Sequence, residues 1–125
     1  MKYKVYVESY FSSAHYLKMY KGKCENLHGH NWKVGVFVES ESLDNLGMVI
    51  DFTKLKKILN EVLEKLDHKV LNKEIKYFKK IPPTAENIAK YIYINLKNSL
   101  KKYKIVQHLK IIVWETPTQA AIYEE

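Results

Sequence analysis

Alternating apolar and polar residues predict two β-strands in the first third of the chain. Residues 2–11 alternate imperfectly between valine and lysine or tyrosine, and this strand is expected to continue to about His15. Residues 31–39 alternate more regularly, with Trp32 and three valines on one face. The two segments predict a hairpin whose connection, residues 18–27, is unusually long, and long connections in compact domains tend to be functional.

Two amphipathic helices are predicted in the middle of the chain. After Asp51, which fits a helix N-cap, apolar residues recur with helical spacing as far as Leu66. Residues 69–83 are expected to be irregular, because they end in two prolines that cannot lie inside a helix. A second helix is expected to begin after Thr84, as its N-cap, and to continue to about Leu100.

Two further alternating segments lie at the end of the sequence. Residues 108–114 predict a third strand, residues 115–118 a turn, and residues 120–124 a fourth strand. The predicted element order is therefore ββααββ. This order indicates an α+β fold in which a four-stranded antiparallel sheet is covered on one face by two helices.

Composition limits the class of protein. A length of 125 residues with 46% hydrophobic content predicts one compact domain, residues 1–125, with a core that needs no disulfide. The formal net charge is +7, and every basic residue is lysine. Arginine is better suited to bidentate phosphate and guanine contacts, so this charge favours a solvated surface over a nucleic-acid footprint. A small polyanionic substrate would fit the same charge.

Cysteine use and hydropathy indicate the compartment. Cys24 is the single cysteine and cannot form an intramolecular disulfide, so a reducing, cytoplasmic setting is expected. No run of about eighteen apolar residues occurs, and the first residues lack the apolar core of a signal peptide. We therefore expect a protein that neither spans a membrane nor is secreted.

Three histidines form a candidate metal site. His28 and His30 stand two apart near the start of a predicted strand, so their imidazoles project to one face. His15 lies on the predicted partner strand and can come opposite that pair. Three imidazoles without a fourth protein ligand suit a catalytic zinc, which keeps one position open, and Cys24 would then be a reactive group beside it. An isolated His-x-His pair is more often incidental, so spacing alone leaves both interpretations open.

Six segments resemble the signatures of a known family and occur in its order over almost the whole sequence. The family is that of 6-pyruvoyltetrahydropterin synthase and 6-carboxytetrahydropterin synthase. Each segment is weak by itself, whereas the ordered set is highly specific. The three-residue spacer between Cys24 and His28 is similar to that of the 6-carboxytetrahydropterin branch. The segments are residues 11–15, 24–31, 47–52, 66–72, 83–89 and 115–117.

The resemblance implies a zinc ion and a general base. The residues that match the family's zinc ligands are His15, His28 and His30. Cys24 matches the family's general base, and a thiol suits that role if nearby positive charge lowers its pKa toward neutrality. Relatives that cleave the substrate to 6-hydroxymethyl-dihydropterin use a glutamate instead, and Glu25 keeps that alternative open.

The resemblance also implies further catalytic and substrate-binding residues. Asp67 and His68 match the other two catalytic residues of the family, although His68 by itself would equally suit a cap on the preceding helix. Glu115 matches the pterin anchor, whose carboxylate accepts hydrogen bonds from the ring N3–H and the 2-amino group. Thr84 and Glu86 lie at a helix start, where they would hold the ring or cap the helix.

The family fold is the tunnelling fold, in which subunits join their sheets edge to edge into a barrel. The resemblance implies a trimer or hexamer with active sites between subunits. The implied activity is a zinc-dependent lyase that converts 7,8-dihydroneopterin triphosphate to 6-carboxy-5,6,7,8-tetrahydropterin, a precursor of 7-deazaguanine bases such as queuosine. The alternatives are the 6-pyruvoyl product and the side-chain cleavage used in folate synthesis. From other classes, a basic nucleic-acid-binding module and an oligomer with a purely structural zinc also remain open.

Overall fold

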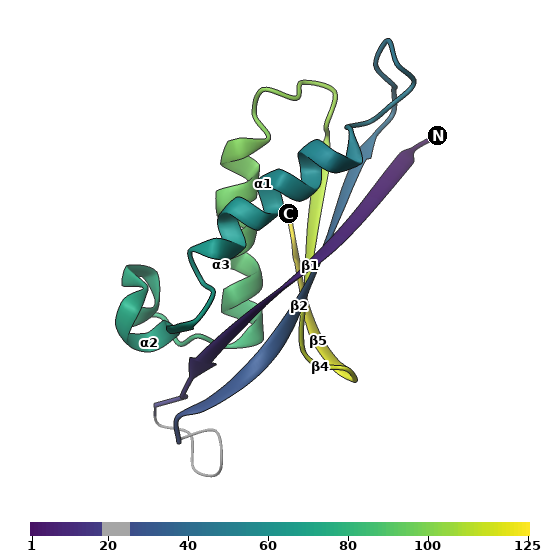
Figure 1. The fold of residues 1–125 in the computed structure, drawn as a ribbon. Coiled ribbons are helices and arrows are strands. Elements are labelled where there is room, and N and C mark those ends of the chain that lie inside the picture. Colours follow the sequence, from purple (N-terminus) through teal and green to yellow (C-terminus); the bar gives the residue numbers. More distant parts are fainter. Residues whose placement is uncertain (19–25) are drawn as a thin grey trace.

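The computed structural model describes residues 1–18 and 26–125 and arranges them as one sheet with helices on one side (Figure 1). All four strands and both helices predicted from the sequence are present. The elements in sequence order are β1 (Tyr3–His15), β2 (His28–Ser40), α1 (Phe52–Glu64), β3 (Lys69–Val70), α2 (Leu71–Glu74), the 3₁₀ helix η2 (Lys76–Lys79), α3 (Ala85–Ser99), β4 (His108–Thr116) and β5 (Gln119–Glu124).

The sheet contains one strand that the sequence did not predict. Its order is β3-β1-β2-β4-β5, and all neighbours are antiparallel except β3, which runs parallel to β1. The expectation that residues 69–83 are irregular was therefore wrong, since this segment contains β3, α2 and η2. Strand β3 consists of two residues and forms because Lys69 and Val70 pair with Ser13 and Ala14, a contact that no local pattern encodes.

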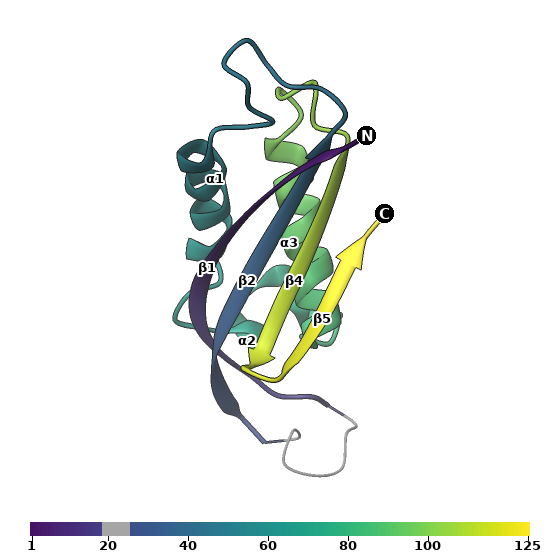
Figure 2. The same cartoon turned by 90° about the vertical axis from the view of Figure 1, so that its right-hand side faces the viewer.

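Helices α1 and α3 cover one face of the sheet and leave the other face bare (Figure 2). In β2 the even-numbered residues from Trp32 to Val38 are fully buried, as period-two alternation requires. Helix α1 packs its leucines onto this face, and Leu55 and Leu59 have no exposed surface. Asp51 caps α1 as predicted, because its Oδ1 accepts hydrogen bonds from Thr53 N and Lys54 N at 2.7 and 3.1 Å.

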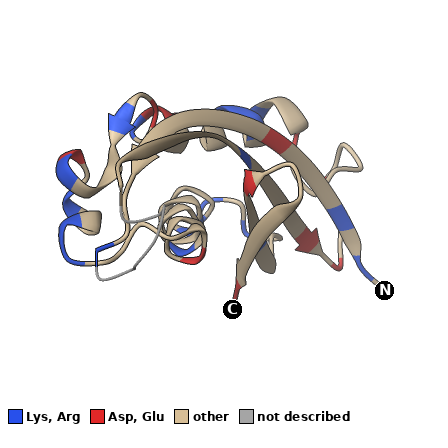
Figure 3. Cartoon of the chain, turned by 90° about the horizontal axis from the view of Figure 1, so that it is seen from below, with Lys and Arg blue, Asp and Glu red and all other residues tan. Residues whose placement is uncertain are grey.

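Charged residues lie on several elements, with lysines and acidic residues interspersed (Figure 3). This distribution agrees with a solvated lysine-rich surface. Among the described helices, none is long and apolar enough to cross a membrane.

The packing of α1 generates a stability prediction. Replacing Leu59 by alanine removes a fully buried side chain and leaves a cavity, so we expect the free energy of unfolding to fall by about 2–5 kcal/mol. The matched control is Leu46→Ala, because Leu46 is 79% exposed. Urea denaturation at a fixed protein concentration measures both changes, and equal effects for the two variants would contradict this description of the core.

Candidate metal centre and active site

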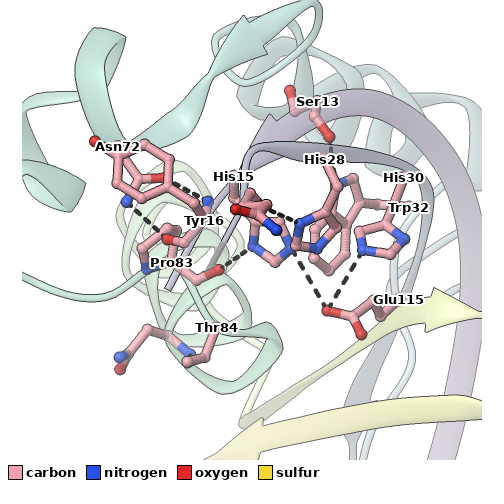
Figure 4. A network of polar contacts seen from close by, with 12 residues as sticks. Ser13, His15, Tyr16, His28, His30, Trp32, Asn72, Pro83, Thr84 and Glu115 are labelled. Atoms are coloured by element: carbon pink, nitrogen blue, oxygen red, sulfur yellow. Dashed lines mark hydrogen bonds and ion pairs between the residues drawn. The ribbon is translucent and has the colours of Figure 1, made fainter. Parts of the chain in front are cut away.

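The β1–β2 hairpin brings the three histidines together at one end of the sheet (Figure 4). Its register pairs His15 with His28 and Ser13 with His30. Because residues two apart in a strand share a face, all three imidazoles lie on the helix-covered face. The structure thus places His15 opposite the His-x-His pair, an arrangement that the strand pattern allowed.

The three imidazoles are close enough to bind one ion. One nitrogen of each ring can be chosen so that all three lie within 4.8 Å of one another. The Nε2 atoms of His15 and His28 are 3.0 Å apart. His15 is 1% exposed, and Trp32 packs beside it with ring centroids 5.1 Å apart. The His15 ring is therefore enclosed by protein atoms, with Trp32 as one of its neighbours.

Backbone carbonyls determine which ring nitrogens face the site. His15 Nδ1 lies 2.7 Å from the Pro83 carbonyl oxygen, and His28 Nδ1 lies 2.7 Å from the Asn26 carbonyl oxygen. A carbonyl oxygen only accepts hydrogen bonds, so both Nδ1 atoms carry the proton. In the neutral rings both Nε2 atoms are therefore unprotonated, and two lone pairs face each other.

The histidine cluster fits a divalent metal. Its third member, His30, has a buried Nε2 without a hydrogen-bond partner among the described residues. A cation between the three rings would satisfy this atom and the two opposed lone pairs. Metal-bound histidines commonly donate the other ring N–H to a backbone carbonyl, which is the arrangement of His15 and His28. Three imidazoles with an open fourth position are typical of catalytic zinc.

Burial also favours the metal-binding form of these rings. Burial lowers the pKa of His15, although the Pro83 carbonyl acts in the opposite direction. Burial likewise lowers the pKa of His30, with Glu115 opposing. Both lowered pKa values favour the neutral ring, and neutral imidazole is the form that coordinates metals.

Glu115 connects the histidines to a neighbouring cavity. Its Oε2 lies 3.8 Å from His15 Nε2 and 3.9 Å from His30 Nε2, near the end of β4. The cavity has a volume of about 600 Å³, and its lining includes Glu115, Thr84 and Glu86. The structure therefore brings the three predicted substrate-binding residues to one cavity beside the candidate metal site. Their roles stay predictions.

Thr84 also caps α3. Its Oγ1 accepts a hydrogen bond from Asn87 N at 3.1 Å. The two interpretations left open by the sequence are thus compatible for Thr84, because the same residue caps the helix and lines the cavity.

Asp67 and His68 form a pair at the outer edge of β1. His68 Nδ1 lies 2.9 Å from Asp67 Oδ2, and Asp67 Oδ1 accepts a hydrogen bond from Ser12 N at 2.8 Å. The His68 side chain is 82% exposed, and its backbone has a φ of 57°, which is uncommon for a residue other than glycine. Within the described part of the protein, no hydrogen bond or ion pair joins this pair to the three histidines.

Two predicted residues cannot be placed. Cys24 and Glu25 lie outside the described residues. The general-base role of Cys24, and the alternative role of Glu25, therefore stay predictions.

Sequence reasoning missed the residues that orient the histidines. The Pro83 and Asn26 oxygens act through the backbone, so their residue types give no signal. Trp32 was assigned to a strand face, but its contacts with the His15 and His30 rings depend on packing. The nearest sequence signal was the Pro82–Pro83 pair directly before a helix cap.

The fold and the site define an α+β protein with a three-histidine cluster that could hold a metal ion at one end of a mostly antiparallel sheet. Residues 4–125 match the family model described as 6-pyruvoyl tetrahydropterin synthase, and the chain belongs to this family. The family assignment made from six sequence segments is therefore confirmed.

Individual relatives carry two different names. The chain is 40% identical over 115 residues to the 6-pyruvoyl tetrahydrobiopterin synthase of Drosophila melanogaster, a match that covers 90% of this chain and 67% of that protein. It is 43% identical over 90 residues to the putative 6-carboxy-5,6,7,8-tetrahydropterin synthase of Archaeoglobus fulgidus, which covers 72% of each. The solved structure of Caenorhabditis elegans 6-pyruvoyl tetrahydropterin synthase superposes with a TM-score of 0.87 at 32% identity, covering 100% of this chain and 96% of that one. The expected α+β tunnelling fold is thereby confirmed for the single chain, whereas the joining of sheets into an oligomeric barrel stays a prediction.

The geometry predicts one divalent ion per subunit. Replacing His28 by alanine should lower zinc affinity by more than about 100-fold, since changes to groups that merely orient ligands already cost 10–100-fold. The control is His108→Ala. His108 is not a member of the three-histidine cluster, and its Nε2 lies 2.9 Å from Glu124 Oε1. Chelator competition measures both affinities. Equal zinc binding by the two variants would contradict the assignment.

The Asp67 pair predicts a pH-dependent stability. The Ser12 N–H holds the pKa of the Asp67 carboxyl below its usual range, and His68 adds to this lowering. A carboxyl whose pKa is lower in the folded state stabilises the fold at any pH above its unfolded-state pKa of about 3.9. This stabilisation is lost as the pH falls through the folded-state pKa. Asp67→Asn should therefore reduce the free energy of unfolding at pH 7, with a smaller difference at pH 3. Urea denaturation of metal-free protein tests this, and a difference independent of pH would oppose it.

Proposed function

We propose that this protein is a zinc-dependent lyase that converts 7,8-dihydroneopterin triphosphate and water to 6-carboxy-5,6,7,8-tetrahydropterin, acetaldehyde and triphosphate. The observation that carries the proposal is the position of Glu115. Its carboxylate lies 3.8 Å from His15 and 3.9 Å from His30, and Glu115 also lines the neighbouring cavity. A cluster that binds a metal beside a carboxylate that selects a ring is the combination this reaction requires.

The branch within the family rests on a smaller feature. The three-residue spacer between Cys24 and His28 is similar to that of 6-carboxytetrahydropterin synthases. The relatives include both branches, so formation of the 6-pyruvoyl product is the second candidate. Cleavage to 6-hydroxymethyl-dihydropterin is a third, with Glu25 as the acid and base.

The protein's own residues supply binding and proton transfer. The Glu115 carboxylate accepts two parallel hydrogen bonds, from the pterin N3–H and 2-amino group, and so selects rings that carry this donor pair. Zinc held by the three histidines would supply Lewis acidity that makes the C–H and O–H protons of the substrate's 6-substituent easier to remove. Cys24 takes a proton as thiolate, and His68, oriented by Asp67, relays it.

The reaction needs Asp67 and His68 near the metal, and an oligomer provides them. In the described residues, β5 and the part of β1 before Ser13 each have a neighbouring strand on one side only. Unpaired edges of this length favour association with another subunit. We infer that copies join edge to edge, as a trimer or hexamer in the cytoplasm, so that the exposed His68 of one copy serves the site of another.

Product analysis tests this function directly. Zinc-loaded protein incubated with 7,8-dihydroneopterin triphosphate should give 6-carboxytetrahydropterin by mass spectrometry. Cys24→Ala should lower kcat by about 10²–10⁴-fold, the usual contribution of a general acid or base, while the zinc content stays at one per subunit.

Two outcomes would redirect the assignment. Unchanged turnover in Cys24→Ala would indicate either a different base or a structural zinc. Salt-sensitive nucleic-acid binding without pterin turnover would support a basic nucleic-acid-binding module instead.

Glu115→Gln should weaken substrate binding, whereas the control Glu124→Gln, on the neighbouring strand, should not.

A further inference from the structure

The orientation of His15 depends on a turn far away in the sequence. His15 Nδ1 donates to the carbonyl oxygen of Pro83 at 2.7 Å, across 68 residues. Pro83 is buried and lies directly before Thr84, the N-cap of α3. The angle of this carbonyl therefore controls which nitrogen of His15 faces the other two histidines.

The Pro83 carbonyl is itself fixed by a tight turn. Thr84 N donates to the Pro82 carbonyl oxygen at 2.9 Å, an i to i+2 hydrogen bond that closes a γ-turn around Pro83. Both prolines have a fixed φ near −65°. The turn therefore leaves the Pro83 carbonyl little rotational freedom.

Asn87 holds the outer side of this turn. Its Nδ2 donates to the same Pro82 carbonyl oxygen at 2.9 Å. Its backbone N–H is already bound by Thr84 Oγ1, so the Asn87 amide group is not needed to cap α3. Asn87 stands three residues after the N-cap, where a glutamate or glutamine is the usual partner in a capping box. The Asn87 amide instead donates to the Pro82 carbonyl oxygen, and that contact leads to the three histidines.

We propose that Asn87 is a positioning residue for the metal centre. Its amide fixes the Pro82 carbonyl, the γ-turn then fixes the Pro83 carbonyl, and that carbonyl holds His15 in the Nδ1–H form with the Nε2 lone pair facing the site. This role of Asn87 rests on the proposed metal site. It is an additional role, because the Asn87 side chain would touch neither the metal nor the substrate.

The same turn reaches the substrate cavity. Thr84 belongs to the turn and to the lining of the cavity that also contains Glu115. Loosening Asn87 should therefore disturb the metal site and one wall of the cavity together, while the rest of α3 stays in place.

The decisive variant is Asn87→Asp. It keeps the size of the side chain but replaces the amide donor by a carboxylate, which repels the Pro82 oxygen. A carboxylate near the start of a helix favours the helix, so α3 should remain as stable as in the wild type. We expect zinc affinity to fall about tenfold, at the lower end of effects seen for groups that orient ligands. We also expect a changed d–d absorption spectrum in the cobalt-substituted protein, with an unchanged thermal midpoint of the metal-free protein.

The matched control is Asn95→Asp in the same helix. Asn95 Nδ2 donates to the Tyr91 carbonyl oxygen at 2.8 Å, the same kind of bond at a distance from the histidines. This variant should bind zinc and cobalt as the wild type does. Asn87→Gln, which retains an amide donor on a longer side chain, should recover part of the affinity.

The outcomes separate this inference from the proposed function. Wild-type zinc affinity and cobalt spectrum in Asn87→Asp would overturn the role of Asn87 and leave the metal site standing. Failure of the wild-type protein to bind zinc would overturn the proposed function and this inference with it. The thermal midpoint of metal-free Asn87→Asp could also fall. If the corresponding loss of folding free energy equals the loss of zinc-binding free energy, Asn87 acts on folding alone, and the inference is overturned.

Discussion

The site depends on two hydrogen bonds from imidazole N–H groups to backbone carbonyls. They give His15 and His28 the same tautomer, so that two Nε2 lone pairs point at each other across 3.0 Å. Such an arrangement is unfavourable without a positive charge between the atoms. The buried Nε2 of His30 has the same need for a partner. A divalent ion would satisfy all three atoms, and the two hydrogen bonds are therefore the feature that makes this histidine cluster fit a metal ion.

The fold makes these bonds possible by fixing the end of β1. A one-residue slip of β1 against β2 would move His15 to the bare face of the sheet, away from His28 and His30. The register is stabilised from the other side by the segment after α1, where Asp67 Oδ1 and the His68 N–H bind the two backbone groups of Ser12. Further along, the side chain of Asn72 pairs with both backbone groups of Tyr16. The segment from Asp67 to Asn72 thus stabilises the end of β1 that carries His15, and it also contains the proposed catalytic pair.

Local sequence patterns predicted most of this architecture, because period-two and helical spacing are properties of contiguous residues. The same patterns showed that His15 could lie opposite the His-x-His pair, and the β1–β2 register places it there. They did not predict β3, whose two residues are strand only through pairing with β1. Neither did they reveal the Pro83 carbonyl, which is 68 residues from His15 in sequence and acts through an atom that every residue has. In the described residues of one chain, Asp67 and His68 make no hydrogen bond or ion pair with the three histidines. In the proposed assembly, the Asp67–His68 pair that completes each site belongs to another copy.

The most direct test of this account is X-ray absorption spectroscopy at the zinc edge of the metal-loaded protein. The account predicts three imidazole nitrogens at about 2.0–2.1 Å and one further oxygen or nitrogen scatterer from solvent. A sulfur scatterer at about 2.3 Å would place Cys24 in the coordination sphere and close the open position. Fewer than three imidazoles around the zinc would contradict the central claim that His15, His28 and His30 together hold the ion.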